Sequence, residues 1–338
     1  MTTIGINGLG RIGRLVLRNE LSRSDGAHPL SITRLNDPAS PPAIAAHLLE
    51  FDSIHGRWAY PIEATPERLR LGEHDIACST EVQISETDWS GCELVIDASG
   101  KHKTVQSLRP YFDQGVKKVL VCAPVKEQGA LNVVVGVNHA LYDPSQHDIV
   151  TAASCTTNCI APAIKVIHEQ LGIRHGSITT VHNITNTQSI LDTPHSDLRR
   201  ARASADSLIP TTTGSATAIA EIFPELRGRL NGHAIRVPVA NASLTDCVFE
   251  LETATDAEQV NQLLRDASSS ALTGILGVED RPLVSIDYRS DPRSSIVDAL
   301  STMVVNHTQL KLYLWYDNEW GYANRVVDLM RLMIQKGI

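Results

Sequence analysis

The chain has few cysteines and no long apolar run, and these absences narrow the class of protein to which it can belong. Its 338 residues include six cysteines, too few for the disulfide scaffold of a small secreted domain. No apolar run approaches the length of a bilayer span, and the N-terminus lacks the basic segment and apolar stretch of an export signal. We therefore expect a cytoplasmic protein with no membrane partner.

The chain also lacks an excess of positive charge. Its net charge of −8 argues against a nucleic-acid partner. The densest basic cluster, residues 199–202, is short and has no aromatic residues between its arginines, so it fits a small anion site or a salt-bridged loop better. Hydrophobic residues at 42% and charged residues at 20% are typical of a soluble globular protein, and the length predicts two domains.

The sequence contains only part of the residue spacing that is typical of a metal site. Cys155 and Cys159 stand four residues apart, as two ligands on one helix face would, but neither a second such pair nor a histidine cluster follows. We expect no metal. Cys155 instead lies in the polar sequence ASCTTNC (residues 153–159), whose small capping residues place it at the start of a predicted helix. The helix N-terminus favours a thiolate there, so the pattern predicts a nucleophile.

The N-terminus carries a pattern typical of dinucleotide binding. A short buried strand, residues 4–6, is predicted before the G-x-G-x-x-G motif formed by Gly8, Gly10 and Gly13. An apolar helical stretch, residues 15–21, follows. In this context the first glycine permits a tight turn, the second lets a pyrophosphate approach the backbone, and the third lets helix and strand pack closely.

A second predicted strand, residues 30–35, is followed by Asp37. A carboxylate at this position would accept hydrogen bonds from the adenosine ribose and repel a 2′-phosphate, which predicts NAD rather than NADP as cofactor. Further strands are predicted at residues 94–97, 119–121 and 133–135. Each ends in small or polar residues, as expected at the carboxyl edge of a parallel sheet.

A candidate base and three candidate anion-binding features lie in the second half. His182 ends a β-branched run and is flanked by hydroxyl and amide residues, so we expect it to accept a proton and to hold the thiolate in an ion pair. Anion sites are indicated by the hydroxyl-rich residues 211–215, by Arg200, and by Arg236 in a strand-like run. The arginine fork suits phosphate, although Arg236 is equally compatible with a structural salt bridge.

Taken together, these motifs resemble the phosphorylating glyceraldehyde-3-phosphate dehydrogenases over nearly the whole chain. The matching stretches are residues 6–14, 153–158, 210–214 and 315–319. The resemblance implies an α/β fold, with an N-terminal Rossmann dinucleotide-binding domain and an α+β catalytic domain that has a mixed sheet. It also implies a homotetramer. The implied domains are residues 1–154, completed by the C-terminal helix at 319–338, and residues 155–318.

The resemblance also implies a reaction. Cys155 would attack the aldehyde of glyceraldehyde 3-phosphate, His182 would take the proton, NAD would accept the hydride, and inorganic phosphate would cleave the resulting thioester to give 1,3-bisphosphoglycerate. The implied substrate-binding residues are Ser154, Thr156, Thr185, Thr187, Arg200, Thr213, Gly214 and Arg236. The implied cofactor-binding residues are Asn7, Gly8, Gly10, Arg11, Ile12, Gly13, Asp37, Ser99, Gly100, Cys122, Asn318 and Tyr322.

The chain departs from the usual family pattern at several positions. Residues 99–102 replace a Thr-Gly pair with following apolar residues, Cys122 replaces a serine or threonine, and Thr193 replaces a leucine. The arginine usual near residues 80–81 is missing. These departures resemble the branch associated with arsenate resistance, which makes 1-arseno-3-phosphoglycerate for export.

Two alternatives remain open. Erythrose-4-phosphate dehydrogenase uses the same cysteine–histidine pair, and residues 290–295 and 318–321 have some of its character. The intact phosphate loop at residues 212–214 and the aspartate at position 37 oppose this alternative. A non-catalytic NAD-binding or RNA-binding scaffold is the second alternative, and the intact catalytic pair opposes it.

Overall fold

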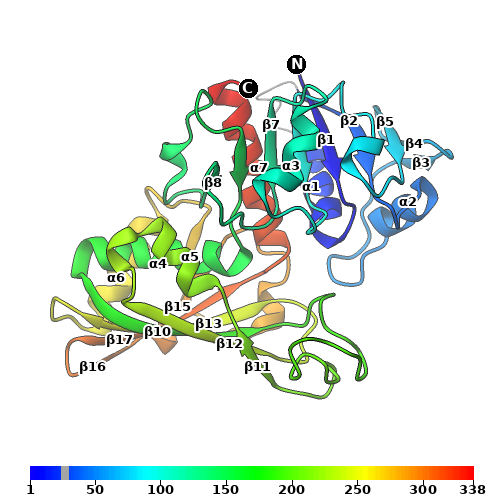
Figure 1. The fold of residues 1–338 in the computed structure, drawn as a ribbon. Helices are drawn as coiled ribbons and strands as arrows, with labels where there is room; N and C mark the ends of the chain where they lie inside the picture. Colours follow the sequence, from blue (N-terminus) through cyan, green and yellow to red (C-terminus); the bar gives the residue numbers. More distant parts are fainter. Residues whose placement is uncertain (24–29) are drawn as a thin grey trace. The chain divides into compact units, whose positions relative to one another are not determined.

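The computed structural model describes residues 1–23 and 30–338. Its contacts divide the chain into two compact units. The N-terminal unit comprises Met1–Ser154 and Ala323–Ile338, and the central unit comprises Cys155–Tyr322 (Figure 1). The chain therefore leaves the N-terminal unit once and returns to it for its last helix.

The N-terminal unit is built on a nine-stranded sheet in the order β3-β4-β5-β2-β1-β6-β7-β9-β8. The strands from β5 to β8 in this order pair in parallel, and β3 and β4 form an antiparallel edge. The predicted Rossmann architecture is confirmed. The strands are β1 Thr2–Asn7, β2 Leu30–Asn36, β3 Ile62–Ala64, β4 Arg68–Leu71, β5 His74–Ser79, β6 Leu94–Asp97, β7 Lys118–Val121, β8 Ala130–Asn132 and β9 Ile149–Thr151. The helices are α1 Arg11–Ser22, α2 Pro42–Glu50, α3 Val105–Phe112 and α7 Trp320–Lys336, with 3₁₀ turns at Ile84–Glu86 and His139–Leu141.

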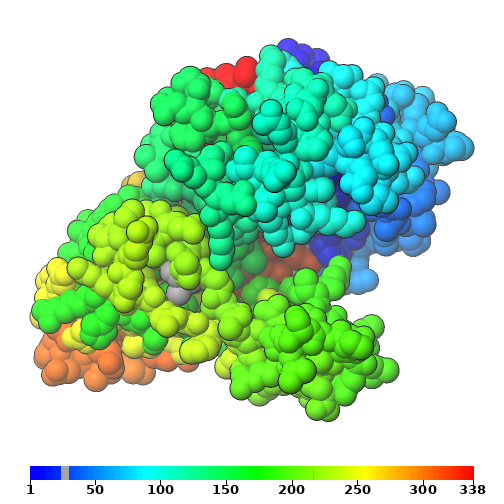
Figure 2. Space-filling view, viewed as in Figure 1, coloured from blue at the N-terminus to red at the C-terminus, as the bar shows by residue number. Residues whose placement is uncertain are grey.

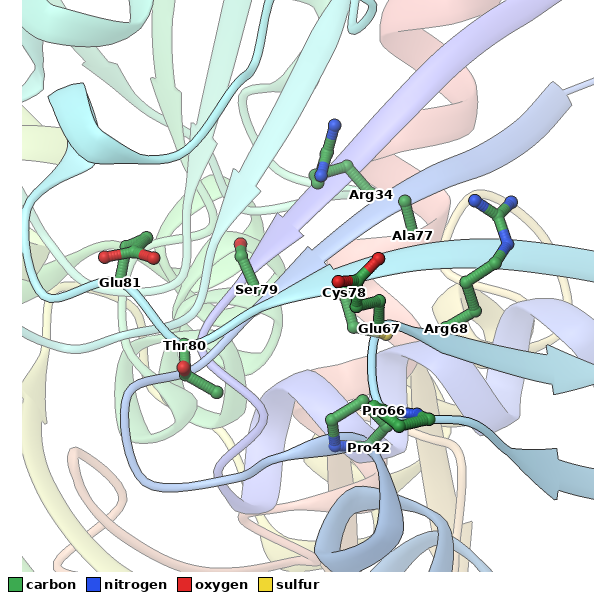
Figure 3. A pocket seen from close by; sticks show the side chains of 10 residues that line it. All are labelled: Arg34, Pro42, Pro66, Glu67, Arg68, Ala77, Cys78, Ser79, Thr80 and Glu81. Carbon is green, nitrogen blue, oxygen red and sulfur yellow. The ribbon is translucent and has the colours of Figure 1, made fainter.

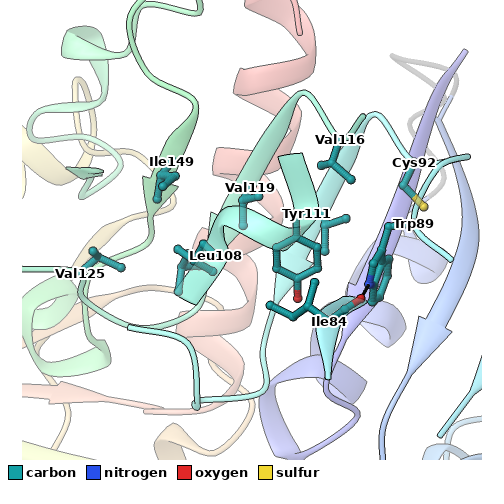
Figure 4. Close-up of a cluster of buried hydrophobic side chains, with 11 residues drawn as sticks. Ile84, Trp89, Cys92, Leu108, Tyr111, Val116, Val119, Val125 and Ile149 are labelled. Carbon is teal, nitrogen blue, oxygen red and sulfur yellow. Dashed lines mark hydrogen bonds between the residues drawn. The ribbon is translucent and has the colours of Figure 1, made fainter. Parts of the chain in front are cut away.

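Helix α3 covers part of this sheet through an apolar cluster (Figure 4). Leu108 and Tyr111 of α3 are fully buried against Val95 of β6 and Val119 of β7, and Trp89 packs edge-on against Tyr111 with ring centroids 5.4 Å apart. Burying side chains of this size contributes about 2 kcal/mol each. The cluster therefore fixes the strands whose carboxyl ends carry the polar residues described below.

The central unit is built on an eight-stranded mixed sheet. Its main order is β11-β12-β10-β13-β17-β15-β14, with β16 paired to β17. Along β13, buried and half-buried residues alternate, as expected for a sheet with one covered face. The predicted mixed sheet is confirmed. The strands are β10 Ile173–His182, β11 Ile209–Thr212, β12 Leu230–Arg236, β13 Ser243–Leu251, β14 Leu276–Glu279, β15 Ser295–Asp298, β16 Met303–Val305 and β17 Gln309–Tyr316. The helices are α4 Cys155–Leu171, α5 Ser215–Ile222 and α6 Ala257–Ser268, with 3₁₀ turns at Pro224–Leu226, Ser285–Tyr288 and Ala299–Ser301.

One predicted strand is wrong. Residues 133–135 leave the sheet, and the strands here are instead β8 and the unpredicted β9. The Asn138 side chain accepts a hydrogen bond from the Val134 N–H at 2.7 Å, and the Val137 N–H donates to the Val134 carbonyl at 3.0 Å. These contacts form a turn. In the part of the chain that the structure describes, no helix is long and apolar enough to cross a membrane.

Candidate active site

Cys155 is the first residue of α4, directly after the chain leaves β9. Ala153 has a φ of 52°, a left-handed value that is uncommon for a residue with a Cβ, and its N–H donates to the Thr151 hydroxyl at 3.1 Å. This bend ends β9 and starts the helix. The predicted position of Cys155 at the mouth of a helix is confirmed, so first-turn N–H groups with no partner inside the helix lie beside the thiol.

Strand β10 brings His182 to this thiol. His182 is the last residue of β10, and its side chain is buried. Its Nε2 atom lies 3.9 Å from Sγ of Cys155, within hydrogen-bond reach of sulfur. The ring of Tyr316, at the end of β17, meets the imidazole edge-on at 6.2 Å. The structure thus joins the predicted nucleophile and base.

The burial of this site acts against the predicted ionisation of the pair. Burial raises the pKa of Cys155 above its ordinary value, although hydrogen bonds from Thr156 and the charge of Arg236 act in the opposite direction. Burial also lowers the pKa of His182 to about 4, and the charge of Arg236 adds to this effect. A buried site penalises both charged forms. Burial therefore opposes a thiolate–imidazolium pair, while the half-exposed thiol, the Thr156 hydrogen bonds and the Arg236 charge favour the thiolate.

Arg236 contacts the other side of the His182 ring. It is the last residue of β12 and stands opposite His182 in the parallel β10–β12 register. Its Nη1 atom lies 2.6 Å from His182 Nδ1 and donates to the Asn183 carbonyl at 3.2 Å. Among the described residues, no carboxylate forms a salt bridge with Arg236. Its guanidinium contacts the imidazole and a backbone carbonyl instead. Asn183 was not predicted from the sequence, because its role depends on a backbone carbonyl.

A second arginine lies close to Arg236. The charge of Arg200 lowers the pKa of Arg236, after the larger effect of burial. Arg200 donates from Nε to the Thr211 hydroxyl at 2.9 Å, and Thr211 donates to Asp197 at 3.1 Å. Two guanidinium groups whose charges act on one another, only one of them close to a carboxylate, favour binding of an anion.

The remaining predicted hydroxyl groups form two local pairs. Thr213 Oγ1 donates to Ser215 Oγ at 3.0 Å, next to Gly214 at the start of α5. Thr185 and Thr187, in the segment after β10, have hydroxyl oxygens 2.9 Å apart. Each pair presents oxygen and backbone donors suited to a phosphate.

Thr156 differs from the expected arrangement. Its hydroxyl is buried and lies 2.8 Å from the Tyr316 hydroxyl, so of its two donors the backbone N–H is the one better placed for an oxyanion. Ser154, half-buried, immediately precedes Cys155. Tyr316 was not predicted, because the contact joins helix α4 to strand β17, which are far apart in the sequence.

In the N-terminal unit, the glycine-rich loop lies at the carboxyl end of β1. Gly8 has a φ of 95°, and a Cβ there would lie 2.5 Å from the Ser99 nitrogen. A Cβ on Gly13 would lie 1.9 Å from the Gly8 carbonyl oxygen. A Cβ on Gly10 would meet nothing within 4 Å. The first and third glycines are therefore required for packing, and the second leaves the open approach that a pyrophosphate needs.

Asp37 follows β2 and contacts this loop. Its carboxylate accepts a hydrogen bond from the Leu9 N–H at 2.6 Å. Arg11 and Ile12 are the first two residues of α1. Arg11 donates to the Asp52 carboxylate at 3.1 Å, and although burial raises the pKa of Asp52, this contact and two backbone N–H donors lower it to about 2. The Arg11 charge is thus neutralised within the unit.

A buried polar network joins the ends of β1, β2 and β6. Asn7 donates to the Tyr111 hydroxyl at 2.6 Å, and Tyr111 donates to Asp97 at 2.8 Å. Asp97 also accepts from the Ser99 hydroxyl at 2.6 Å, and Asn36 donates to Asn7 at 2.9 Å. The predicted residues Asn7 and Ser99 are therefore held by Tyr111, Asn36 and Asp97, none of which was predicted as a site residue.

The other predicted residues of this edge lie nearby in the fold. The exposed Gly100 follows Ser99, and Cys122 follows β7, where its N–H donates to the Asp97 carbonyl at 2.8 Å. Burial raises the pKa of the Cys122 thiol. Cys122 is therefore neutral at physiological pH.

Asn318 lies just before α7 and Tyr322 lies in its first turn; both residues belong to the central unit, which ends at Tyr322. Asp317 caps this helix by accepting from the N–H groups of Glu319 and Trp320, each at 2.8 Å. Asn318 is buried, and within the described residues its Oδ1 atom has no hydrogen-bond partner. An unpartnered buried amide oxygen next to a fixed helix start fits the role of holding a carboxamide.

Two pockets are lined mostly by residues that were not predicted as site residues. The first, of about 370 Å³, is next to the end of β5 in the N-terminal unit (Figure 3), and the second, of about 780 Å³, borders β10, β11 and β12 in the central unit. The second shares Thr211 and Asp197 with the Arg200 network. The first pocket is lined by Arg34, Pro42, Pro66, Glu67, Arg68, Ala77, Cys78, Ser79, Thr80 and Glu81.

Comparisons with known proteins show the family of this chain. Residues 2–105 match the family described as glyceraldehyde 3-phosphate dehydrogenase, NAD binding domain, and residues 154–318 match its C-terminal domain. The chain is 57% identical over 331 residues to glyceraldehyde-3-phosphate dehydrogenase 3 of Nostoc sp. strain PCC 7120, covering 97% of each chain. It is 45% identical to glyceraldehyde-3-phosphate dehydrogenase 1 of Bacillus cereus over all of both chains. It is also 44% identical to the glyceraldehyde-3-phosphate dehydrogenase of Geobacillus stearothermophilus, over 99% of each chain. The chain belongs to the glyceraldehyde-3-phosphate dehydrogenase family, and its N-terminal domain is an NAD-binding domain.

Proposed function

We propose that this protein oxidises glyceraldehyde 3-phosphate with NAD and inorganic phosphate, using Cys155 as nucleophile and His182 as base. The observation that supports this most strongly is the 3.9 Å contact between Sγ and Nε2 beside Arg236. The thiol supplies a strong nucleophile once it loses its proton, and a neutral imidazole is the form that can take that proton.

The reaction has two stages. Cys155 Sγ forms a bond to the aldehyde carbon while its proton passes to His182 and the carbonyl π electrons move to oxygen, giving the oxyanion of a thiohemiacetal. NAD, when bound, supplies the acceptor for the hydride that leaves this carbon. The oxygen of the resulting thioester lies near the α4 N-terminus, where each N–H donor to an oxyanion typically contributes about 3 kcal/mol to lowering the barrier. A phosphate oxygen then attacks the thioester carbon, and the C–S bond breaks to release the cysteine and 1,3-bisphosphoglycerate.

We assign the anion-binding residues to two phosphates. Arg236, Thr185 and Thr187 bind the substrate phosphate. Ser154, the Thr156 N–H, Arg200, Thr213 and Gly214 bind the attacking phosphate. The proximity of the two guanidinium groups supports a site that handles more than one phosphate charge.

The cofactor is assigned to the polar edge of the N-terminal unit. Asp37 discriminates against the 2′-phosphate of NADP, and Asn318 holds the nicotinamide carboxamide. The other residues we assign to NAD are Asn7, Gly8, Gly10, Arg11, Ile12, Gly13, Ser99, Gly100, Cys122 and Tyr322. For Arg11 the assignment rests on its backbone N–H, since its side chain pairs with Asp52.

Arsenate is a second acceptor for the same thioester. It has nearly the shape and charge of phosphate, so the pocket accepts both, and the product would be 1-arseno-3-phosphoglycerate. The departures from the family pattern at residues 99–102, Cys122 and Thr193 support this role in the cell.

We further propose a cytoplasmic homotetramer. The segment between β10 and β11, green in Figure 2, stands out on the surface of the central unit and exposes Ile190 (78%), Leu191 (75%) and Leu198 (82%). A cluster of apolar side chains this exposed is typical of a surface that is covered by another chain. All six cysteines lie within the described residues as free thiols, in agreement with a reducing compartment. Light scattering should give the mass of four chains, and the mass of one chain would contradict the proposal.

One assay tests the proposed activity. NADH formation is measured from glyceraldehyde 3-phosphate and from erythrose 4-phosphate, each with phosphate, with arsenate or with neither. We expect rapid turnover of glyceraldehyde 3-phosphate only when an oxyanion is present. Equal rates with and without the oxyanion, and a preference for erythrose 4-phosphate, would favour the erythrose enzyme.

A further inference from the structure

Asp317 connects three segments of the central unit through one buried carboxylate. It follows β17 directly and is 1% exposed. Its Oδ1 atom accepts from the N–H groups of Glu319 and Trp320, each at 2.8 Å, and from the Asn241 amide at 3.1 Å. Its Oδ2 atom accepts from the Ser290 N–H at 2.7 Å. The start of α7 is therefore tied to the connection between β12 and β13 and to the loop before β15.

The loop that contains Ser290 is held in one bent conformation. Ser290 has a φ of 63°, a left-handed value that a residue with a Cβ adopts only when its surroundings compensate for the strain. Two residues earlier, the ring of Tyr288 stacks on that of Trp315 with centroids 5.2 Å apart. Trp315 lies two residues before Asp317. The ring stack and the Ser290 hydrogen bond thus hold the loop against the end of β17 at two points.

The first turn of α7 packs directly on the same loop. A Cβ on Gly321 would lie 2.7 Å from the Arg293 carbonyl oxygen and 3.5 Å from the Asp291 carbonyl oxygen. The first distance is too short for a Cβ, so this close approach requires glycine. Arg293 is fixed in turn by two hydrogen bonds to the Asp291 carboxylate, at 2.6 and 3.0 Å. Residues 290–295, which stood out in the sequence, therefore help to set the position of the helix start.

Asn318 lies between the capping carboxylate and the capped helix. Its backbone is held on both sides, because Asp317 accepts from the Glu319 N–H. Its side chain is buried, and within the described residues its Oδ1 atom has no hydrogen-bond partner. A buried acceptor without a partner costs free energy until a ligand or a water satisfies it. The NH₂ group of a carboxamide is a donor of the matching kind.

We propose that Asp317 is a positioning residue for cofactor recognition, which fixes Asn318 so that its Oδ1 atom can accept from the carboxamide of NAD. This inference rests on the proposed function and deepens it, because it assigns the support of the residue that recognises the nicotinamide. Asp317 is assigned no contact with NAD and acts through the start of α7 and the Ser290 loop. An acceptor that is held in place before binding loses little conformational entropy when the ligand arrives.

The test is calorimetric titration of the full-length protein with NAD. Asp317→Asn replaces one acceptor oxygen by an NH₂ group, so at least one of the donors around it loses its partner. We expect the Kd for NAD to rise by about tenfold, the factor that one net hydrogen bond contributes. Asp256→Asn is the matched control, because Asp256 caps α6 by accepting from the Gln259 N–H at 2.9 Å. It should leave the Kd unchanged.

A second measurement needs no ligand. Hydrogen–deuterium exchange of the NAD-free protein should show faster exchange at the N–H groups of Glu319 and Trp320 in Asp317→Asn than in the wild type. Unchanged exchange at both groups would show that the carboxylate does not hold the helix start, and would overturn the inference.

A double-mutant cycle separates positioning from a general structural role. Asn318→Ala removes the amide itself and should raise the Kd for NAD by a similar factor. Adding Asp317→Asn to this variant should change the Kd little further, because both substitutions remove the same contact. Full additivity of the two effects would overturn the inference, as would an unchanged Kd in Asp317→Asn alone.

If Asp317→Asn fails to fold, Gly321→Ala takes its place in the titration and in the cycle. Its added Cβ displaces the start of α7 from the Arg293 carbonyl and leaves every capping group present. An unchanged Kd for NAD in Gly321→Ala would then overturn the inference. NADH formation from glyceraldehyde 3-phosphate by the wild type separates the two proposals. An active wild type with additive variants refutes only the role of Asp317, whereas an inactive wild type refutes the proposed function.

Discussion

Arg236 Nη1 lies 2.6 Å from His182 Nδ1, on the side of the ring opposite the nitrogen that faces Cys155. One guanidinium therefore touches the base and is also assigned to the substrate phosphate. This relationship follows from the parallel pairing of β10 and β12, whose last residues are these two side chains. The contact joins the proposed base to the residue that we assign to the substrate phosphate.

Replacing the nucleophile should separate catalysis from cofactor binding. We expect Cys155→Ser to lose turnover by about a thousandfold or more while NAD binding is unchanged, because a hydroxyl is a much weaker nucleophile than a thiol. Steady-state NADH formation and calorimetric titration with NAD measure the two properties. Cys78→Ser, a half-buried thiol of the N-terminal unit, is the control and should keep wild-type turnover. Undiminished activity in Cys155→Ser would refute the nucleophile assignment.

The ionisation of the pair predicts a pH profile. Because burial raises the Cys155 pKa, the reactive thiolate increases as pH rises through that raised value. We expect the rate of iodoacetamide alkylation, followed by mass spectrometry of the Cys155 peptide, to be still rising above the ordinary thiol pKa of about 8.5. His182, with a pKa of about 4, stays neutral across this range and adds no second step. A plateau reached below pH 7 would instead show a preformed thiolate–imidazolium pair.

Cofactor choice tests the role of the Asp37 charge. We expect the wild type to prefer NAD over NADP by at least about tenfold in kcat/KM, equivalent to about 1.4 kcal/mol. Asp37→Asn should narrow this preference, because it removes the repelling charge while keeping an acceptor for the Leu9 N–H. Asp37→Ala, which removes both, should in addition weaken NAD binding. Equal use of both cofactors by the wild type would show that the carboxylate does not discriminate.

The buried network at the sheet edge makes a stability prediction. Tyr111→Phe removes the hydroxyl that joins Asn7 to Asp97, leaving a buried donor and a buried acceptor each short of one partner. We expect a loss of about 1–3 kcal/mol in the free energy of unfolding, measured by urea titration. Tyr60→Phe, at a stacked tyrosine nearer the surface, should change the stability by much less. Equal stability of the two variants would mean that the network contributes nothing to folding.

Local sequence patterns predicted the parts of the fold that depend on neighbouring residues. The glycine motif, the strand ends and the polar sequence around Cys155 are contiguous, and each has its expected place in the structure. The predicted strand at residues 133–135 is wrong because a side chain four residues from Val134 forms a turn there. Hydrophobic periodicity contains no information about such a side-chain contact.

Contacts between distant residues could not be predicted in this way. Tyr111, Asp52 and Tyr316 are joined to predicted residues only by the tertiary fold. The effect of burial on the Cys155 pKa could not be predicted for the same reason: a helix N-terminus is visible in the sequence, but the burial that raises the pKa is not. His182 contacts Cys155 through one ring nitrogen and Arg236 through the other. The second contact depends on the register of β10 and β12, which the sequence does not show.

The most direct measurement of the central claim is the product formed when phosphate and arsenate are both withheld. Protein is mixed with NAD and glyceraldehyde 3-phosphate, NADH is followed, and the intact and digested protein is analysed by mass spectrometry. We predict a burst of NADH equal to the number of chains and a phosphoglyceroyl group on the peptide that contains Cys155, released when phosphate is added. Sustained turnover without any oxyanion, or an acyl group on another residue, would contradict the account.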